Sequence, residues 1–159
     1  MKPRLYLETS IVSYLAALPS RDLVVAAHQQ ITHEWWAERH RYELFVSELV
    51  IQEITMGDRD AAKRRLLLVD SIPVLAVDAE AVALSRQLQE CAMLPAKANV
   101  DSLHISLAAL QQVDYLLTWN CRHIANSRTR RAIDEILKIR EMPSPAIVTP
   151  EELLEEEEL

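Results

Sequence analysis

The sequence predicts an α/β domain in which helices cover both faces of a central parallel sheet. Short apolar segments alternate with longer helix-like segments along the whole chain of 159 residues, and this alternation is typical of a parallel sheet. The apolar segments lack regular polar positions, as expected for strands that are buried on two faces. The length suits one domain with a sizeable core. We therefore expect a three-layer α/β/α sandwich.

Five segments are expected to be strands because they are short, apolar and rich in aromatic or β-branched residues. In chain order they are residues 5–7, 44–46, 74–77, 115–119 and 146–148. The first of them, Leu5-Tyr6-Leu7, runs directly into an acidic residue and then into a helix-like segment. The chain therefore begins as strand, acid, helix.

The helices between these strands are predicted from apolar spacings of three and four and from their end signals. Thr9 and Ser10 supply hydroxyls that suit the start of the first helix, and Gly57, the only glycine, is placed to end the third. Pro95 predicts a break before the sixth. The expected helices are residues 9–17, 22–40, 47–54, 59–70, 78–91, 98–112 and 127–140.

The charge of the chain is unevenly distributed. The net charge is −7, and six glutamates among residues 151–159 account for all but one unit of it. We expect one domain over residues 1–150 and an acidic C-terminal tail over 151–159, in which the glutamates of 155–158 are disordered and solubilising. Basic residues cluster in 59–65 and 122–140. They are either phosphate-binding groups or ordinary exposed helix faces.

The composition points to a reducing compartment and away from membranes. The two cysteines, Cys91 and Cys121, form no paired motif, which argues against both a disulfide framework and a zinc knuckle. No uninterrupted apolar run approaches the roughly 18 residues that a membrane span needs. We expect a cytoplasmic protein with neither an export signal nor an anchor.

Three scattered carboxylates and one amide are the candidate site residues. Glu8 follows the first strand and Asn120 follows the fourth, whereas Glu53 and Asp101 lie on predicted helices. Ligands of open α/β sheets collect at the carboxyl ends of the strands. Carboxylates are costly to gather unless a cation lies among them, and a hard divalent ion is the usual occupant. If the four residues converge, we expect a metal-dependent phosphodiesterase.

Each candidate also has an ordinary structural interpretation. Taken without any family resemblance, Glu53 is better explained as an exposed helix residue, the commonest place for a glutamate. Asp101 is also explained as a charge favoured by a helix N-terminus. Glu8 would serve as the cap of the helix behind it. His104, one turn after Asp101, is better explained as a packed, hydrogen-bonded histidine than as a metal ligand.

Five segments, in order over almost the whole chain, resemble the PIN-domain ribonucleases, including VapC-like toxins. They are Leu7-Glu8-Thr9-Ser10, residues 47–54 (Ser-Glu-Leu-Val-Ile-Gln-Glu-Ile), Asp101-Ser102-Leu103-His104-Ile105, residues 118–126 (Thr-Trp-Asn-Cys-Arg-His-Ile-Ala-Asn) and Thr149-Pro150-Glu151-Glu152-Leu153. The resemblance implies five parallel strands in order 3-2-1-4-5, an acidic cluster that binds Mg2+ or Mn2+, and cleavage of single-stranded RNA. It further implies a homodimer held by a cognate antitoxin.

The resemblance also suggests a role for each candidate. Glu8 and Asp101 would contact the metal, and Glu53 would be a further ligand or would orient the attacking water. Asn120 would hold a metal-bound water. The supporting residues, which would hydrogen-bond the carboxylates or the scissile phosphate, are Thr9, Ser10, Thr118 and His104.

Two positions depart from the pattern of the family. Glu8 stands where the family usually has an aspartate, and Asn120 stands where many members have another. A longer first carboxylate and one fewer negative charge favour a weaker metal site. The leading hypothesis is therefore an endoribonuclease toxin. The alternative is a PIN-fold module with little or no catalysis that binds RNA or a protein.

Overall fold

The computed structural model describes residues 1–91 and 98–157 and contains the predicted parallel sheet. The sheet has five strands in the order β3-β2-β1-β4-β5, and all four neighbouring pairs are parallel. The strands are β1 (Arg4–Leu7), β2 (Glu43–Ser47), β3 (Val74–Leu75), β4 (Tyr115–Leu117) and β5 (Ala146–Val148). The predicted fold class and strand order are confirmed.

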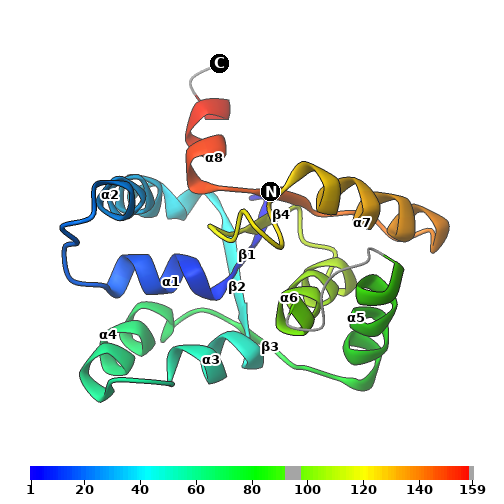
Figure 1. Cartoon of the computed structure of the whole chain (residues 1–159), viewed down its shortest axis with the longest axis horizontal. Helices are drawn as coiled ribbons and strands as arrows, with labels where there is room; N and C mark the ends of the chain where they lie inside the picture. The colour runs from blue at the N-terminus through cyan, green and yellow to red at the C-terminus, as the bar shows by residue number, and fades with distance from the viewer. Residues whose placement is uncertain (92–97, 158–159) are drawn as a thin grey trace.

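Helices cover both faces of this sheet, as Figure 1 shows. On one side lie α1 (Thr9–Ala16), α2 (Leu23–Ala37), α3 (Glu48–Ile54) and α4 (Arg59–Val69), and on the other lie α5 (Ala79–Cys91), α6 (Asn99–Leu110) and α7 (Ser127–Ile139). A short 3-10 turn, η1 (Arg39–Arg41), precedes β2, and α8 (Pro150–Glu157) follows β5. None of the helices in these ranges is long and apolar enough to cross a bilayer.

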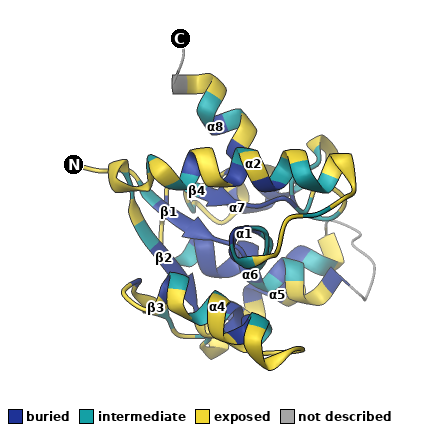
Figure 2. Ribbon diagram, turned by 90° about the vertical axis from the view of Figure 1, so that its left-hand side faces the viewer, coloured by how far each residue is buried: buried dark blue, intermediate teal, exposed yellow. Residues whose placement is uncertain are grey.

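The central strands form the core of the domain. In Figure 2 most of β1 and the second half of β2 are dark blue, for buried, whereas the outer sides of the helices are yellow, for exposed. Leu5, Tyr6 and Leu7 of β1 have no exposed surface, and neither do Leu116 and Leu117 of β4. Strands buried on both faces need apolar side chains at successive positions, which explains why these segments show no polar alternation.

Several helices begin where a polar side chain caps them. Asp22, Ser47, Asp58 and Asn126 each accept a hydrogen bond from the backbone N–H three residues later, which satisfies a donor that the first turn leaves free. Gly57 lies beyond the end of α3 with φ of +85°, a conformation that glycine adopts without strain. These local signals explain why most helix positions were predictable.

Some boundaries differ from the expectation. The helix expected over 22–40 ends at Ala37, because the chain turns at Glu38 into η1. The strand expected over 115–119 ends at Leu117, and the one expected over 74–77 ends at Leu75. The expected break at Pro95 lies outside the described residues.

The interpretation of 155–158 as a disordered run is wrong for the described part of that run. Residues up to Glu157 belong to α8, which contacts α2, and its Leu153 is only 2% exposed. The helix begins with a capping box, since Thr149 Oγ1 accepts from the N–H of Glu152 (3.3 Å) and a Glu152 carboxylate oxygen accepts from the N–H of Thr149 (2.7 Å). Pro150 suits the first helical position. These contacts outweigh the repulsion among the glutamates.

Candidate active site

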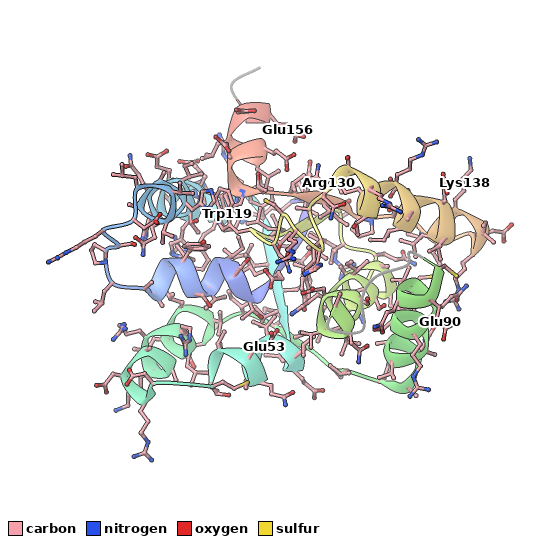
Figure 3. The ribbon with its side chains drawn as sticks, viewed as in Figure 1. Glu53, Glu90, Trp119, Arg130, Lys138 and Glu156 are labelled. Atoms are coloured by element: carbon pink, nitrogen blue, oxygen red, sulfur yellow. The ribbon has the colours of Figure 1, made fainter. Side chains whose placement is uncertain are left out.

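The four predicted site residues line one hollow at the carboxyl ends of the central strands. Glu8 follows β1 and Asn120 lies in the loop after β4, while Glu53 comes from α3 and Asp101 from α6. The hollow has a volume of about 490 Å³ and is also lined by Thr9, Ser10 and Tyr14 among others. Figure 3 labels Glu53 between α3 and the end of β2. Residues far apart in the sequence are thus brought together at one edge of the sheet.

Glu8 is held by hydroxyl and backbone donors. It is 6% exposed, and its Oε2 accepts hydrogen bonds from the Ser10 N–H (3.0 Å), from the Ser10 hydroxyl and from Thr118 Oγ1 (2.8 Å). The first of these bonds caps α1. The functional and the structural interpretations of Glu8 are therefore compatible, because one oxygen caps the helix and the other remains for the hollow.

The loop after β4 is attached to the Glu8 carboxylate through Ser10 and Thr118. Ser10 Oγ accepts from the N–H of Trp119 (2.9 Å), and Thr118 Oγ1 accepts from the N–H of Asn120 (2.9 Å). Ser10 and Thr118 thus connect the carboxylate of Glu8 to the backbone that carries Asn120. The structure places both hydroxyls as supports of a carboxylate.

Glu53 is oriented by two side chains. Its Oε1 accepts from Thr9 Oγ1 (2.8 Å) and lies 2.7 Å from Nε2 of His104. Burial by itself raises the pKa of Glu53, but the hydrogen bond and charge of His104, together with the hydrogen bond from Thr9, outweigh burial and lower the pKa overall. Glu53 is therefore an ionised carboxylate at neutral pH.

A buried chain of hydrogen bonds stands behind Glu53. His104 is completely buried, its Nδ1 lies 2.7 Å from the Tyr6 hydroxyl, and that hydroxyl lies 2.8 Å from Ser47 Oγ. When the imidazole is neutral, Nε2–H donates to the ionised Glu53, so Nδ1 must accept from Tyr6 and Ser47 must donate to Tyr6. Burial raises the pKa of Tyr6, which keeps its hydroxyl protonated as this arrangement requires. The expectation of a packed, hydrogen-bonded histidine describes what the structure contains.

Asp101 and Asn120 form a second pair. Asn120 Nδ2 donates to Asp101 Oδ1 (3.0 Å), and Asn120 Oδ1 accepts from the N–H of His123 (3.0 Å). A backbone N–H can only donate, so the amide oxygen must face His123 and the NH2 group must face Asp101. The oxygen that was expected to hold a metal-bound water is therefore used inside the loop.

The charge balance of the hollow is negative. Asp101 lies in the first turn of α6, where the helix dipole favours a carboxylate. Its pKa is nevertheless raised, first by burial and then by the charges of Glu8 and Glu53, against the opposing effect of His123 and His104. Three carboxylates are thus close enough to repel one another, and a cation in the hollow would relieve that repulsion.

The free oxygens of these carboxylates determine what the hollow can bind. Glu8 Oε1, Glu53 Oε2 and Asp101 Oδ2 accept no hydrogen bond from the described residues. In the same ranges the only buried side-chain N or O atoms without a partner are Trp35 Nε1 and Arg130 Nε, so the three free oxygens reach solvent. Oxygen-only ligands of this kind suit Mg2+ or Mn2+.

The described residues do not form a closed metal cage. Within residues 1–91 and 98–157, no group of three or more His, Cys, Asp or Glu side chains is arranged to hold a metal ion. Mg2+ is usually bound through one or two carboxylates and keeps several of its waters. The donor set therefore fits a hydrated hard cation held by part of the cluster, and does not fit a fully dehydrated one.

Three residues around the hollow were missed by the sequence analysis, namely Tyr6, Ser47 and Tyr14. Tyr6 precedes Glu8 by two positions in an extended segment, and Tyr14 follows Ser10 by four positions on α1. Both spacings place side chains on one face. These spacings could have indicated the two tyrosines, whereas the contact of Ser47 with Tyr6 spans 41 positions and has no local signal.

Comparison with known proteins supports the fold. No family model and no curated protein sequence matches the chain. A chain in the crystal structure of VapBC2 from Rickettsia felis, bound to a DNA fragment from their promoter, superposes with a TM-score of 0.58 at 14% identity and covers 91% of this chain and 97% of that one. VapC20 of Mycobacterium tuberculosis, described as a sarcin-ricin loop cleaving toxin, superposes with a TM-score of 0.56 at 17% identity, covering 76% and 93%. This chain therefore has the PIN-like fold of the VapC structures, as its sequence motifs predicted.

Proposed function

We propose that this chain is a divalent-metal-dependent endoribonuclease that cleaves single-stranded RNA as the toxin of a type II toxin-antitoxin pair. The observation that carries the proposal is the convergence of three carboxylates on one hollow, each with an oxygen that no described residue uses. VapC20 has the same fold and is described as cleaving the sarcin-ricin loop, which supports RNA as the substrate class.

In this proposal the residues of the hollow divide the work of metal binding and positioning. Glu8 and Asp101 hold the ion, and Glu53 is a further ligand or orients the attacking water. A bound Mg2+ or Mn2+ supplies Lewis-acid polarisation of a phosphoryl oxygen and makes a bound water more acidic. Thr9, Ser10, Thr118 and His104 restrict the carboxylate rotamers through the hydrogen bonds described above. Asn120 positions Asp101 through its amide nitrogen.

The basic clusters differ in how well they suit RNA. Arg64 and Arg65 donate to backbone carbonyls at the ends of α1 and α3, and Arg130 is paired with Glu152. Arg122 and Arg128 are exposed on and after the loop that carries Asn120, and neither forms an ion pair within the described ranges. We assign contact with the RNA phosphates to these two arginines.

Cleavage of a labelled single-stranded RNA tests the proposal. We expect Mn2+- or Mg2+-dependent cleavage that EDTA abolishes, and a loss of roughly 100-fold or more in Asp101→Ala, because several kcal/mol of charge stabilisation would be removed. Asp114→Ala is the matched control, since Asp114 accepts from the Arg4 N–H at the opposite end of the sheet. Cleavage that persists in EDTA, or that falls equally in both variants, would contradict the proposed role of Asp101.

The hydrogen bonding of Asn120 supports a second candidate function. Its oxygen is used by His123, and the described residues form no closed metal cage. A PIN-fold module that binds RNA or a protein with little turnover would have these properties. Filter binding of the same RNA, without cleavage at millimolar Mn2+, would favour this candidate.

Partner and compartment are further parts of the proposal. We treat residues 1–150 as the PIN-like domain and 151–159 as an acidic C-terminal segment, in a cytoplasmic homodimer that an antitoxin inhibits. The VapBC2 structure, a complex bound to promoter DNA, supports a toxin-antitoxin context. The test is whether a small protein encoded next to this chain co-purifies with it and suppresses RNA cleavage.

A further inference from the structure

The outer edge of β5 pairs with no strand among the described residues. β5 bonds to β4 through residues 146 and 148, since the Ala146 N–H donates to the Asp114 carbonyl (2.9 Å) and the Thr118 N–H donates to the Val148 carbonyl (3.0 Å). Alternate residues of a strand direct their backbone groups to opposite sides. The N–H and C=O of Ile147 therefore face away from the sheet, and no described residue bonds to either.

A hollow of about 720 Å³ runs along this edge. Five consecutive residues, Ser144 to Val148, line it, and they include all of β5. Because successive side chains of a strand point to opposite faces, a hollow that contacts all three residues of β5 lies along the strand edge and not on one face of the sheet. Unpaired strand edges in natural proteins are usually covered or blunted. This one opens into a space larger than the carboxylate hollow, which measures about 490 Å³.

The walls of this edge groove come from α7 and α8, and they are acidic. Arg130 and Asp134 line it from α7, and Glu152, Glu155 and Glu156 from α8; Figure 3 labels Arg130 and Glu156 on these two helices. Arg130 is neutralised by Glu152 at 3.1 Å, and Asp134 accepts a hydrogen bond from Ser144. Glu155 and Glu156 are exposed and have no partner in the described ranges. They leave two carboxylates available to a ligand.

We propose that the edge groove binds an extended, basic segment of another protein, which adds a strand beside β5. An extended chain is the ligand that satisfies the backbone groups of Ile147, as in other cases of strand addition to a sheet edge. Lysine or arginine side chains on that segment would meet Glu155 and Glu156. RNA is disfavoured by the acidic walls, and a second copy of this chain is disfavoured because it would bring two acidic walls together.

This surface is separate from the carboxylate hollow, so its test does not depend on nuclease activity. We suggest titrating the 15N-labelled full chain with a nine-residue peptide of alternating lysine and threonine, blocked at both ends, and following backbone amide shifts. Two control peptides have the same length. One alternates glutamate and threonine, and the other has the basic sequence with an N-methyl group on every backbone nitrogen, which removes the donors needed for strand pairing in either register.

We expect the basic peptide to shift the amides of 146–149, with the largest shift at Ile147, and the two control peptides to leave them unchanged. The double variant Glu155→Lys/Glu156→Lys should lower the affinity for the basic peptide by about tenfold, since two favourable charge contacts become unfavourable. Glu151→Lys is the matched control on the same helix, because Glu151 is exposed but does not line the groove. It should change the affinity by less than about twofold.

Four outcomes would overturn the proposal. They are the absence of binding at millimolar peptide, equal binding of the acidic or N-methylated peptide, shifts confined to other parts of the chain, and equal weakening by Glu151→Lys. A single-stranded RNA that shifted the Ile147 amide instead would assign the edge groove to nucleic acid. Dimerisation of the chain through this edge, detected as a concentration-dependent shift of the same amide without peptide, would assign it to a second copy.

Discussion

Removing the Tyr6 hydroxyl is the sharpest test of the buried chain behind Glu53. In Tyr6→Phe the ring remains in its place in the core, but the hydroxyl that bonds both His104 Nδ1 (2.7 Å) and Ser47 Oγ (2.8 Å) is lost. All three residues have no exposed surface, so water cannot readily replace the missing group. The variant therefore isolates the contribution of one buried polar atom.

The expected loss of stability follows from the partners that are left behind. A buried polar group that loses its hydrogen-bond partner costs about 1 to 3 kcal/mol. His104 Nδ1 loses its donor, whereas Ser47 Oγ still accepts from the N–H of Val50 (3.2 Å) and loses only an acceptor. We therefore expect a decrease of about 2 to 4 kcal/mol in the free energy of unfolding. A domain of ordinary stability, about 5 to 15 kcal/mol, would still fold.

Urea unfolding of the metal-free protein measures this difference. The midpoint should fall while the dependence on urea stays the same, because the native core keeps its surface. Tyr115→Phe is the matched control: Tyr115 lies on the neighbouring strand β4, and its hydroxyl makes no hydrogen bond to the described residues. Its unfolding free energy should change by less than about 0.5 kcal/mol. If the two variants had the same stability, the hydrogen-bond chain from Ser47 to Glu53 would not exist as described.

Two further substitutions test the electrostatics of the hollow and the attachment of α8. Because the pKa of Asp101 is raised on folding, its protonated carboxyl group favours the folded state at pH below the unfolded pKa, and that contribution is lost as pH rises through the folded pKa and the group ionises. In EDTA, Asp101→Asn should therefore have a higher Tm than the unsubstituted chain at pH 7 and the same Tm at pH 3. A lower Tm of the variant at pH 7 would contradict the repulsion among the three carboxylates. Leu153 is only 2% exposed and is the buried apolar residue of α8. Leu153→Ala should therefore lower the free energy of unfolding by about 2 to 4 kcal/mol. An unchanged urea midpoint would show that α8 is not packed on the domain.

The order and type of the elements were predictable from local pattern. Unbroken apolar runs such as Leu5–Leu7 indicate strands buried on both faces, and capping residues such as Asp22 and Asp58 indicate helix starts. Among the described elements, the sequence analysis missed the short turn η1 and the helix α8, although the signals of α8 are also local. Thr149, Pro150 and Glu152 form a capping sequence, but the glutamates after them favoured an interpretation as disorder.

The site was predictable in outline for a topological reason. Glu8 and Asn120 follow parallel strands, and the ends of parallel strands share one edge of the sheet, so their proximity followed from the expected fold. Glu53 and Asp101 lie on helices, where no local pattern specifies which way a side chain points. Their placement in the hollow depends on how α3 and α6 pack against the sheet.

The detailed chemistry of the hollow depends on contacts between distant residues. Tyr6 meets His104 across 98 positions, and Thr118 meets Glu8 across 110. These contacts determine which oxygen of each carboxylate is free and which way the Asn120 amide faces. Periodicity and capping depend on residues that are close together in the sequence. The amino-acid sequence alone was therefore enough to predict the α/β architecture. The packing of segments far apart in the sequence decides three features: the orientation of each carboxylate, the buried hydrogen-bond chain behind Glu53, and the open edge of β5. Only the tertiary structure specifies these features, because no local pattern determines how distant segments pack.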